Sequence, residues 1–143
     1  MKIKVLLVDD EKEFVEALAE RLETRDFDVV KAFGGDEALA KIAVEDVDVV
    51  VLDVLMPGKD GVETLREIKQ AKPILEVIML TGNATVSSAV EGMKLGAYDY
   101  LMKPAETKDL VEKIIKAYKR KVDQEERIRK AEIERIMLTR GWD

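Results

Sequence analysis

Two kinds of apolar segment alternate along this chain, and their alternation constrains the fold more than any other feature. Short continuous runs rich in Val, Ile and Leu predict strands at 5–8, 29–33, 47–52, 77–80 and 98–102. After each run, apolar residues recur at helical spacing, as Phe14, Leu18 and Leu22 do after the first. Strands that alternate with helices in this way are typical of an α/β fold built on a parallel sheet.

Right-handed crossovers leave few compact arrangements for five such units. We therefore expect a doubly wound, flavodoxin-like (βα)5 parallel sheet with the strand order 2-1-3-4-5. Asp10 with Glu13 and Asp60 with Glu63 have the spacing of capping boxes and predict two helix starts. Gly96 is expected where the fourth helix ends.

The last helical pattern, which starts near Asp109, is too long for a five-strand domain. Its predicted packing stripe is Val111, Ile114, Ile115, Tyr118 and Val122. Beyond it, residues 123–127 are polar, and Glu125 with Arg129 and Glu126 with Lys130 have favourable i,i+4 spacing. We therefore expect a domain at 1–121 and a C-terminal helical extension at 122–143. The few apolar residues of the extension are expected to pack on the domain or on a partner.

Composition excludes several classes of function. The 143 residues carry 24 Lys and Arg against 30 Asp and Glu, a formal net charge of -6, which argues against nucleic acid or an anionic membrane as the main partner. Cysteine and histidine are both absent, which removes disulfides, the usual zinc sites and His-based catalysis. The first apolar run is far too short for a signal peptide or a membrane span, so a cytoplasmic protein is expected.

Five polar residues follow the predicted strands: Asp9, Asp10, Asp53, Thr81 and Lys103. Ligands of open parallel sheets bind beyond the carboxyl ends of the strands, and strands one and three are neighbours in the expected order, so the three aspartates should meet. Their mutual repulsion calls for a compensating cation. Mg²⁺ suits the group because it takes oxygen ligands from one or two carboxylates and a phosphate.

Lys103 adds a point charge and Thr81 a hydroxyl, and both suit phosphoryl oxygens. A carboxylate at such a site can act as a nucleophile. The five residues together therefore predict phosphoryl transfer.

Four motifs occur in order along the chain: Val8-Asp9-Asp10, the segment from Val51 to Gly61, Leu80-Thr81-Gly82, and the segment from Gly96 to Pro104. With this combination the sequence resembles the receiver domain of bacterial two-component response regulators over roughly residues 2–121. The stretch 81–97 is most similar to receivers of the nitrogen-regulator type. Gly82 stands where many relatives have alanine.

The resemblance implies a phosphorylation-dependent signalling switch. Asp53 would accept a phosphoryl group from the phosphohistidine of a sensor histidine kinase or of a phosphotransfer protein. Mg²⁺ would be bound directly by Asp10 and Asp53, mainly through water by Asp9, and by the backbone carbonyl of Leu55.

The resemblance also implies how the signal is passed on. Lys103 would pair with the phosphoryl group, Thr81 would move to bond it, and Tyr100 would follow Thr81 inward. A downstream protein or effector is the expected target, and a homodimer is a further expectation to test. The chain would not be an enzyme beyond catalysing its own phosphorylation and dephosphorylation.

Three rival functions remain to be weighed. A phosphatase of the haloacid dehalogenase type needs a second aspartate two residues after the nucleophile, where Leu55 stands. A flavin or nucleotide binder needs a glycine-rich or hydroxyl-rich cradle, whereas the first strand runs into Asp9-Asp10-Glu11. A protein-interaction module of the same fold that is never phosphorylated would not respond to Mg²⁺, which a titration followed by fluorescence or NMR would reveal.

Overall fold

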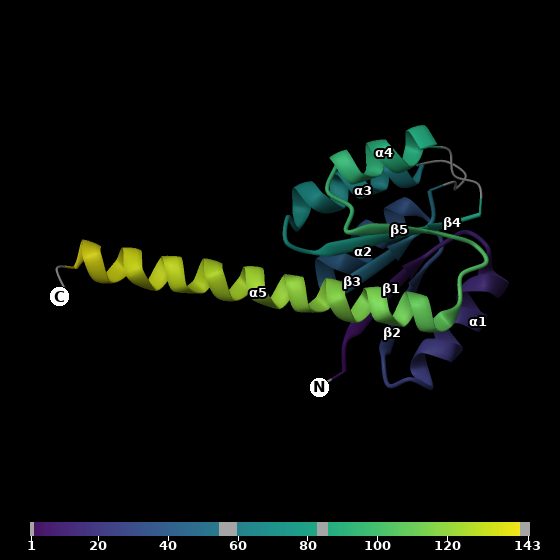
Figure 1. The fold of residues 1–143 in the computed structure, drawn as a ribbon, viewed down its shortest axis with the longest axis horizontal. Coiled ribbons are helices and arrows are strands. Elements are labelled where there is room, and N and C mark those ends of the chain that lie inside the picture. The colour runs from purple at the N-terminus through teal and green to yellow at the C-terminus, as the bar shows by residue number, and fades with distance from the viewer. Residues whose placement is uncertain (1, 55–59, 83–85, 141–143) are drawn as a thin grey trace.

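Five parallel strands form one sheet in the order β2-β1-β3-β4-β5 (Figure 1). The structure is a computed structural model, and it describes residues 2–54, 60–82 and 86–140. The strands are β1 Lys4–Val8, β2 Asp28–Ala32, β3 Val49–Leu52, β4 Glu76–Thr81 and β5 Asp99–Met102. The predicted fold class and strand order are confirmed. β3 starts two residues later than predicted, because the N–H of Val47 donates to the carbonyl of Glu45 in a turn.

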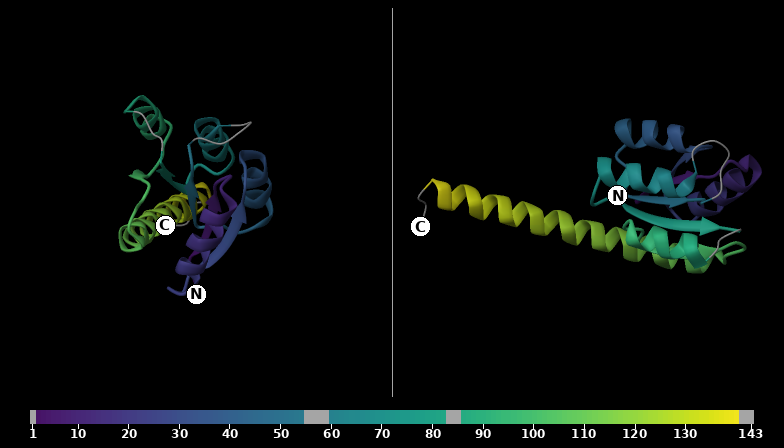
Figure 2. Two further views of the ribbon diagram at one scale, coloured as in Figure 1. Left: turned by 90° about the vertical axis from the view of Figure 1, so that its right-hand side faces the viewer. Right: turned by 90° about the horizontal axis from the view of Figure 1, so that it is seen from above.

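Helices cover both faces of the sheet (Figure 2). They are α1 Lys12–Glu23, α2 Gly35–Val44, α3 Gly61–Ala71, α4 Val86–Lys94 and α5 Thr107–Thr139. α1 and α5 pack on one face, and α2 and α3 pack on the other, with α4 beside α3. This two-sided cover is what right-handed crossovers from strand to parallel strand produce.

The three central strands β1, β3 and β4 are largely apolar on both sides because each side meets a different helix layer. In β1, Val5 and Leu7 belong to the core beneath α1 and α5, whereas Leu6 and Val8 belong to the core beneath α2 and α3. All four are at most 2% exposed. Alternate residues of a strand point to opposite faces, so a strand buried on both sides reads as a continuous apolar run.

Two of the predicted helix ends are confirmed, and one is wrong. The Asp60 carboxylate accepts the N–H of Glu63 at 2.8 Å and caps α3. Gly96, with φ of 103°, ends α4 in a Schellman turn, in which the N–H of Ala97 donates to the carbonyl of Gly92. Asp10 does not cap α1, since the N-cap is Glu11, whose N–H donates to the Asp9 carboxylate at 3.0 Å.

The last helix differs from the prediction in its packing face. The residues of α5 that are buried are Leu110, Ile114, Ala117 and Lys121. Val122, predicted in the packing stripe, is 41% exposed, and the ammonium of Lys121 instead lies 3.4 Å from Asp48 at the start of β3. The ion pairs of the extension also differ, since Glu125 pairs with Lys121, and Glu126 pairs with Arg129.

α5 continues as one helix beyond the sheet and projects from the body of the molecule (Figure 1). Within the described ranges, no helix is both long and apolar enough to cross a bilayer.

Candidate functional site

The sheet edge at the carboxyl ends of β1, β3 and β4 carries the predicted site. Each of three site residues directly follows a strand and donates its backbone N–H to the neighbouring strand. Asp9 donates to Ala32, Asp53 donates to Val8 at 2.9 Å, and Lys103 donates to Thr81 at 2.9 Å. The hydrogen-bond pattern of the sheet thus extends one residue past each strand and fixes the positions from which these three side chains project.

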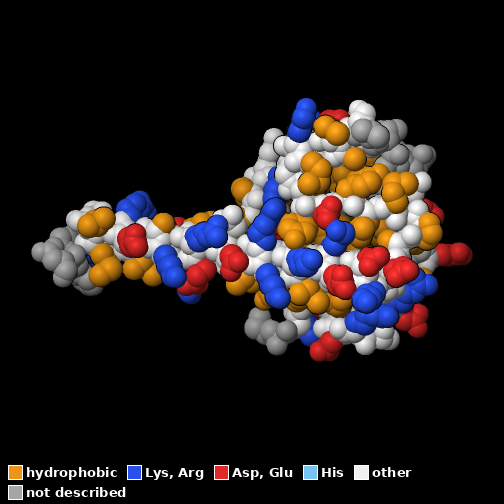
Figure 3. Space-filling model, viewed as in Figure 1, with side chains coloured by type: hydrophobic (Ala, Val, Ile, Leu, Met, Phe, Trp, Pro, Cys, Tyr) orange, Lys and Arg blue, Asp and Glu red, His pale blue; other side chains and the backbone are white. Residues whose placement is uncertain are grey.

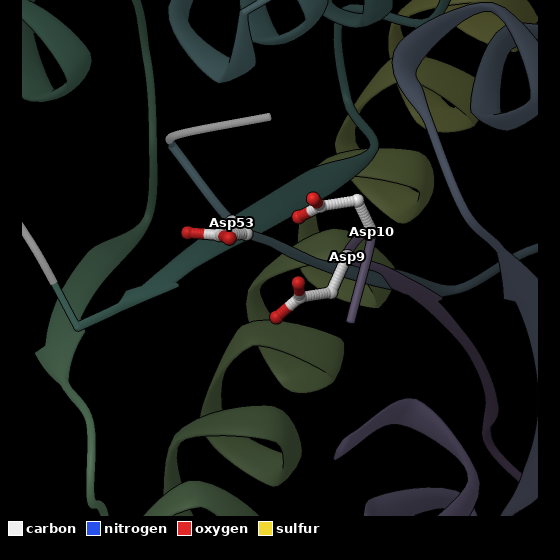
Figure 4. A group of neighbouring side chains, drawn as sticks. All are labelled: Asp9, Asp10 and Asp53. Carbon is white, nitrogen blue, oxygen red and sulfur yellow. The ribbon is translucent and has the colours of Figure 1, made fainter. Parts of the chain in front are cut away.

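Asp9, Asp10 and Asp53 come together as predicted. Each offers a carboxylate oxygen, and these three oxygens lie within 4.8 Å of one another. In Figure 4 the side chains project from the ends of β1 and β3 into the same space. Asp9 is 3% exposed and Asp53 5%, whereas Asp10 is exposed to solvent.

Lys103 enters this cluster from the end of β5, 94 residues along the chain from Asp9. Its ammonium donates to the Asp9 carboxylate at 2.5 Å, lies 3.3 Å from Glu11 and lies 3.9 Å from Asp53. The side chain is 14% exposed. The peptide between Lys103 and Pro104 is cis. One cation is therefore shared among three carboxylates.

Burial and charge act against each other at this site. Burial raises the pKa of Asp9, and the Asp53 charge raises it further, while the hydrogen bonds from Lys103 and from the N–H of Glu11 lower it. For Lys103, burial lowers the pKa, but the hydrogen bond to Asp9 and the charges of Asp9 and Asp53 outweigh it and leave the pKa raised. Lys103 is therefore a cation at neutral pH, and the carboxylates around it repel one another.

Thr81 and Tyr100 lie beside this cluster on β4 and β5. Thr81 is the last residue of β4 and is 1% exposed. Tyr100 pairs with Met79 in the sheet register. The Tyr100 hydroxyl lies 3.1 Å from the sulfur of Met102, a residue that is 48% exposed. The tyrosine hydroxyl thus points toward the exposed end of β5.

Gly61 shows how closely α3 approaches the site. A Cβ at this position would lie 2.3 Å from the carbonyl oxygen of Asp53, a distance that no side chain tolerates. The N–H of Gly61 donates to the carbonyl of Val54 at 2.7 Å. The start of α3 is thereby held against the backbone that carries Asp53. Leu55, the predicted carbonyl ligand, lies outside the described residues.

Two residues that contact Lys103, Phe14 and Glu11, were not predicted from the sequence. The ammonium of Lys103 lies 4.1 Å from the ring centroid of Phe14, a cation–π contact, and Glu11 is its third carboxylate neighbour. No spacing along the sequence signals this contact, because Lys103 lies 89 residues after Phe14. The helical pattern places Phe14 in the packing face of α1, and Phe14 does pack against the core beneath α1 and α5.

The donor set suits a hard divalent cation. It consists of carboxylate oxygens alone, and Mg²⁺ with oxygen ligands at about 2.1 Å places ligands across the ion about 4.2 Å apart. The three carboxylate oxygens all lie within 4.8 Å of one another, so they gather around a space of the size that one ion occupies. A dication would also relieve repulsion that the single ammonium of Lys103 leaves uncompensated.

Known proteins share both the sequence and the fold. The family model of the response regulator receiver domain matches residues 5–115. The transcriptional regulatory protein CpxR of Klebsiella pneumoniae is 43% identical over 111 residues, which are 78% of this chain and 47% of that protein. The chain therefore spans about half the length of this curated relative.

Solved structures agree with this match. A CheY-like receiver domain protein from Methanospirillum hungatei is 30% identical, with a TM-score of 0.83 over 87% of this chain and 99% of the other. NtrX from Brucella abortus is 32% identical, with a TM-score of 0.82 over 88% of this chain and 29% of the other. The chain therefore belongs to the response regulator receiver domains, the phosphorylation-dependent signalling domains of two-component systems.

Proposed function

We propose that Asp53 is the phosphoacceptor of this receiver and that the phosphoryl donor is the phosphohistidine of a sensor histidine kinase or of a phosphotransfer protein. The observation that supports it is the meeting of Asp9, Asp10, Asp53 and Lys103 at one edge of the sheet. These four side chains come from three strand ends. Gathering buried carboxylates costs free energy because they repel one another, and binding of a charged ligand accounts for the cluster.

The reaction is a displacement at phosphorus. A carboxylate oxygen of Asp53 forms the new O–P bond while the P–N bond to the donor imidazole breaks, and the imidazole leaves with the bonding electrons. Lys103, 3.9 Å from Asp53, bonds the phosphoryl oxygens and neutralises part of their negative charge while the group is transferred. Asp9 holds Lys103 through the 2.5 Å hydrogen bond and so orients it.

Asp9, Asp10 and Asp53, with the carbonyl of Leu55, are the proposed ligands of Mg²⁺. When bound, the ion supplies positive charge next to the phosphoryl oxygens. Asp10, which is exposed and does not cap α1, is free to turn to a ligand at the cluster. Lys103 would give up part of its contact with Asp9 when a phosphoryl group arrives.

Thr81 and Tyr100 are the proposed switch. The Thr81 hydroxyl bonds a phosphoryl oxygen on Asp53, and Tyr100 then leaves Met102 and turns inward, which changes the surface around β5. A difference of about 1–3 kcal/mol between the two states is enough for useful switching. The chain catalyses only its own phosphorylation and dephosphorylation, and its output is docking on a downstream protein.

We further propose that residues 1–121 form the receiver proper and that 122–143 are an appended helical extension. The family match ends at residue 115, and the last buried residue of α5 is Lys121.

The test of the acceptor is labelling with radioactive acetyl phosphate and Mg²⁺. The wild-type chain should take up one phosphoryl group, and Asp53→Ala should take up none. Asp46→Asn, which alters an exposed aspartate on the loop before β3, is the matched control and should label normally. Labelling of Asp53→Ala at the wild-type level would refute the assignment.

The test of the metal site uses stability, which does not depend on phosphorylation. Mg²⁺ at ten times its dissociation constant should raise the free energy of unfolding by about 1.4 kcal/mol. Asp10→Ala should lose most of this increase while it folds normally, because Asp10 is exposed and supports no packing. An equal Mg²⁺ response in Asp10→Ala and wild type would exclude Asp10 as a ligand.

A further inference from the structure

The outer half of α5 makes no packing contact that buries it. Its last buried residue is Lys121, and residues 127–140 are all exposed. From Val122 to Thr139 the helix extends by about 27 Å at 1.5 Å per residue. Figures 1 and 2 show it standing clear of the sheet and of the other helices. In proteins, most of the stability of a helix comes from the packing of one face, and this segment has no such packing within the described chain.

One face of this projecting segment carries most of its exposed aliphatic side chains. Val122 and Ile133 are eleven residues apart, which is three helical turns, and Ile136 follows three residues later. Their exposed fractions are 41%, 49% and 49%. Figure 3 shows apolar side chains on the projecting helix between charged ones. Ile128 and Leu138 lie on other sides of the helix.

The same face carries two opposite charges at its middle. Glu126 and Arg129 lie between Val122 and Ile133 at spacings of four, three and four residues, so they continue the same stripe. They form an ion pair within the helix, both partly exposed. We call Val122, Glu126, Arg129, Ile133 and Ile136 the tail face.

We propose that the tail face binds the tail face of a second copy of this chain, with the two helices antiparallel. A two-fold axis midway between positions 127 and 128 brings Val122 level with Ile133 of the second copy. The same axis brings Glu126 level with Arg129 of the second copy, and each of these contacts occurs twice. At these four positions apolar residues thus meet apolar residues and each carboxylate meets a guanidinium, while Ile136 lies level with the exposed Lys119 of the second copy.

A parallel pair does not have this complementarity. Identical residues face one another across a parallel two-fold axis, so Glu126 would face Glu126 and Arg129 would face Arg129. Surface ion pairs add little affinity, but like charges that face one another repel and so disfavour the parallel pair. Aliphatic burial therefore drives the association, and the two central charges set its direction.

Disulfide cross-linking tests the direction, since the natural chain contains no cysteine. Val122→Cys and Ile133→Cys are made separately in the full chain, with tags of different size. An equimolar mixture should cross-link as the mixed dimer, because a disulfide requires Cα atoms within about 7 Å, and each variant alone should cross-link poorly. If each variant cross-links with itself as fast as the mixture does, the antiparallel pairing is wrong.

Sedimentation equilibrium tests the surface itself. The full chain should show a mass that rises with concentration toward that of two chains. Glu126→Arg turns two attractive contacts into repulsive ones and should weaken dimerisation about tenfold. Glu134→Arg makes the same change of charge on another side of the helix and should leave dimerisation unchanged. A wild-type chain that stays monomeric at every concentration, or an equal effect of the two variants, would overturn the proposal.

Discussion

Phe14→Leu is predicted to slow the phosphorylation of Asp53, although the Phe14 ring carries no group that could bind the metal or a phosphoryl oxygen. The ring of Phe14 lies against the ammonium of Lys103, with 4.1 Å from the nitrogen to the ring centroid. Opposite the ring, Asp9 accepts a hydrogen bond from the same ammonium. Phe14 is therefore a positioning residue, which keeps Lys103 from swinging toward solvent.

The magnitude follows from the exposure of the contact. Cation–π pairs are worth about 0.5–1 kcal/mol in water and about 2 kcal/mol or more when desolvated. The Lys103 side chain is 14% exposed, so a value of about 1 kcal/mol is appropriate. If the whole of this energy orients Lys103, its loss slows the reaction about fivefold. Leucine keeps the apolar volume beside α1 and removes only the aromatic face.

The assay is the initial rate of labelling by acetyl phosphate at saturating Mg²⁺. Phe33→Leu is the matched control, because the ring of Phe33 lies 5.6 Å from the ammonium of Lys12, a second cation–π contact that does not involve Lys103. The control should react at the wild-type rate. Equal rates for Phe14→Leu and wild type would show that Asp9 alone holds Lys103 and would refute the reasoning.

Three further predictions concern stability. Ile114→Ala should lower the free energy of unfolding by about 3 kcal/mol in urea, because Ile114 lies on the inner face of α5 and is fully buried. Gly82→Ala should raise it by about 0.4–1 kcal/mol, because the new Cβ would lie 3.6 Å from Lys103, an ordinary contact, and the unfolded chain loses freedom. Burial raises the pKa of Asp99, but the hydrogen bonds from Lys113 and from the N–H of Tyr100, together with the Lys113 charge, outweigh it and leave the pKa below its ordinary value of 3.8, so this pair stabilises the fold above that pH. The stability difference between wild type and Lys113→Gln, followed by urea unfolding, should therefore shrink as the pH falls below 3.8.

Each of these has its control. Val44→Ala, at an 82% exposed position, should change the free energy of unfolding by less than about 0.5 kcal/mol. If Ile114→Ala also costs less than about 0.5 kcal/mol, the packing of α5 on the sheet is contradicted. Gly61→Ala should destabilise strongly, in contrast to Gly82→Ala, because its Cβ would collide with the Asp53 carbonyl. A stability difference for Lys113→Gln that grows on acidification would show that the ion pair with Asp99 is not what stabilises this region.

The central strands β1, β3 and β4 were predictable because they are buried on both faces. Residues such as Val5, Leu6, Leu7 and Val8 have to be apolar whichever face they meet, so burial leaves a continuous signal in the sequence. The carboxylate cluster was predictable for a related reason, since the strand order alone makes the ends of β1 and β3 neighbours. Asp60 was correctly identified as a helix cap because capping depends on local spacing.

The errors occurred where a side chain outside the helix decided the outcome. Asp10 has the local spacing of a cap, but Asp9 takes the Glu11 N–H and leaves Asp10 at the carboxylate cluster. Lys121 replaces Val122 in the buried face of α5 because Asp48, 73 residues earlier in the chain, accepts its ammonium. Neither partner can be identified from spacing along the helix.

The sequence by itself determined the layers of this protein, the order of its strands and the edge at which its acidic residues collect, because these depend on local periodicity and on the handedness of crossovers. The tertiary structure decided which groups surround the Lys103 ammonium and which face of α5 stays uncovered. Those outcomes depend on contacts between residues tens of positions apart. The distances between such residues depend on how the helices pack on the sheet and not on any local sequence pattern.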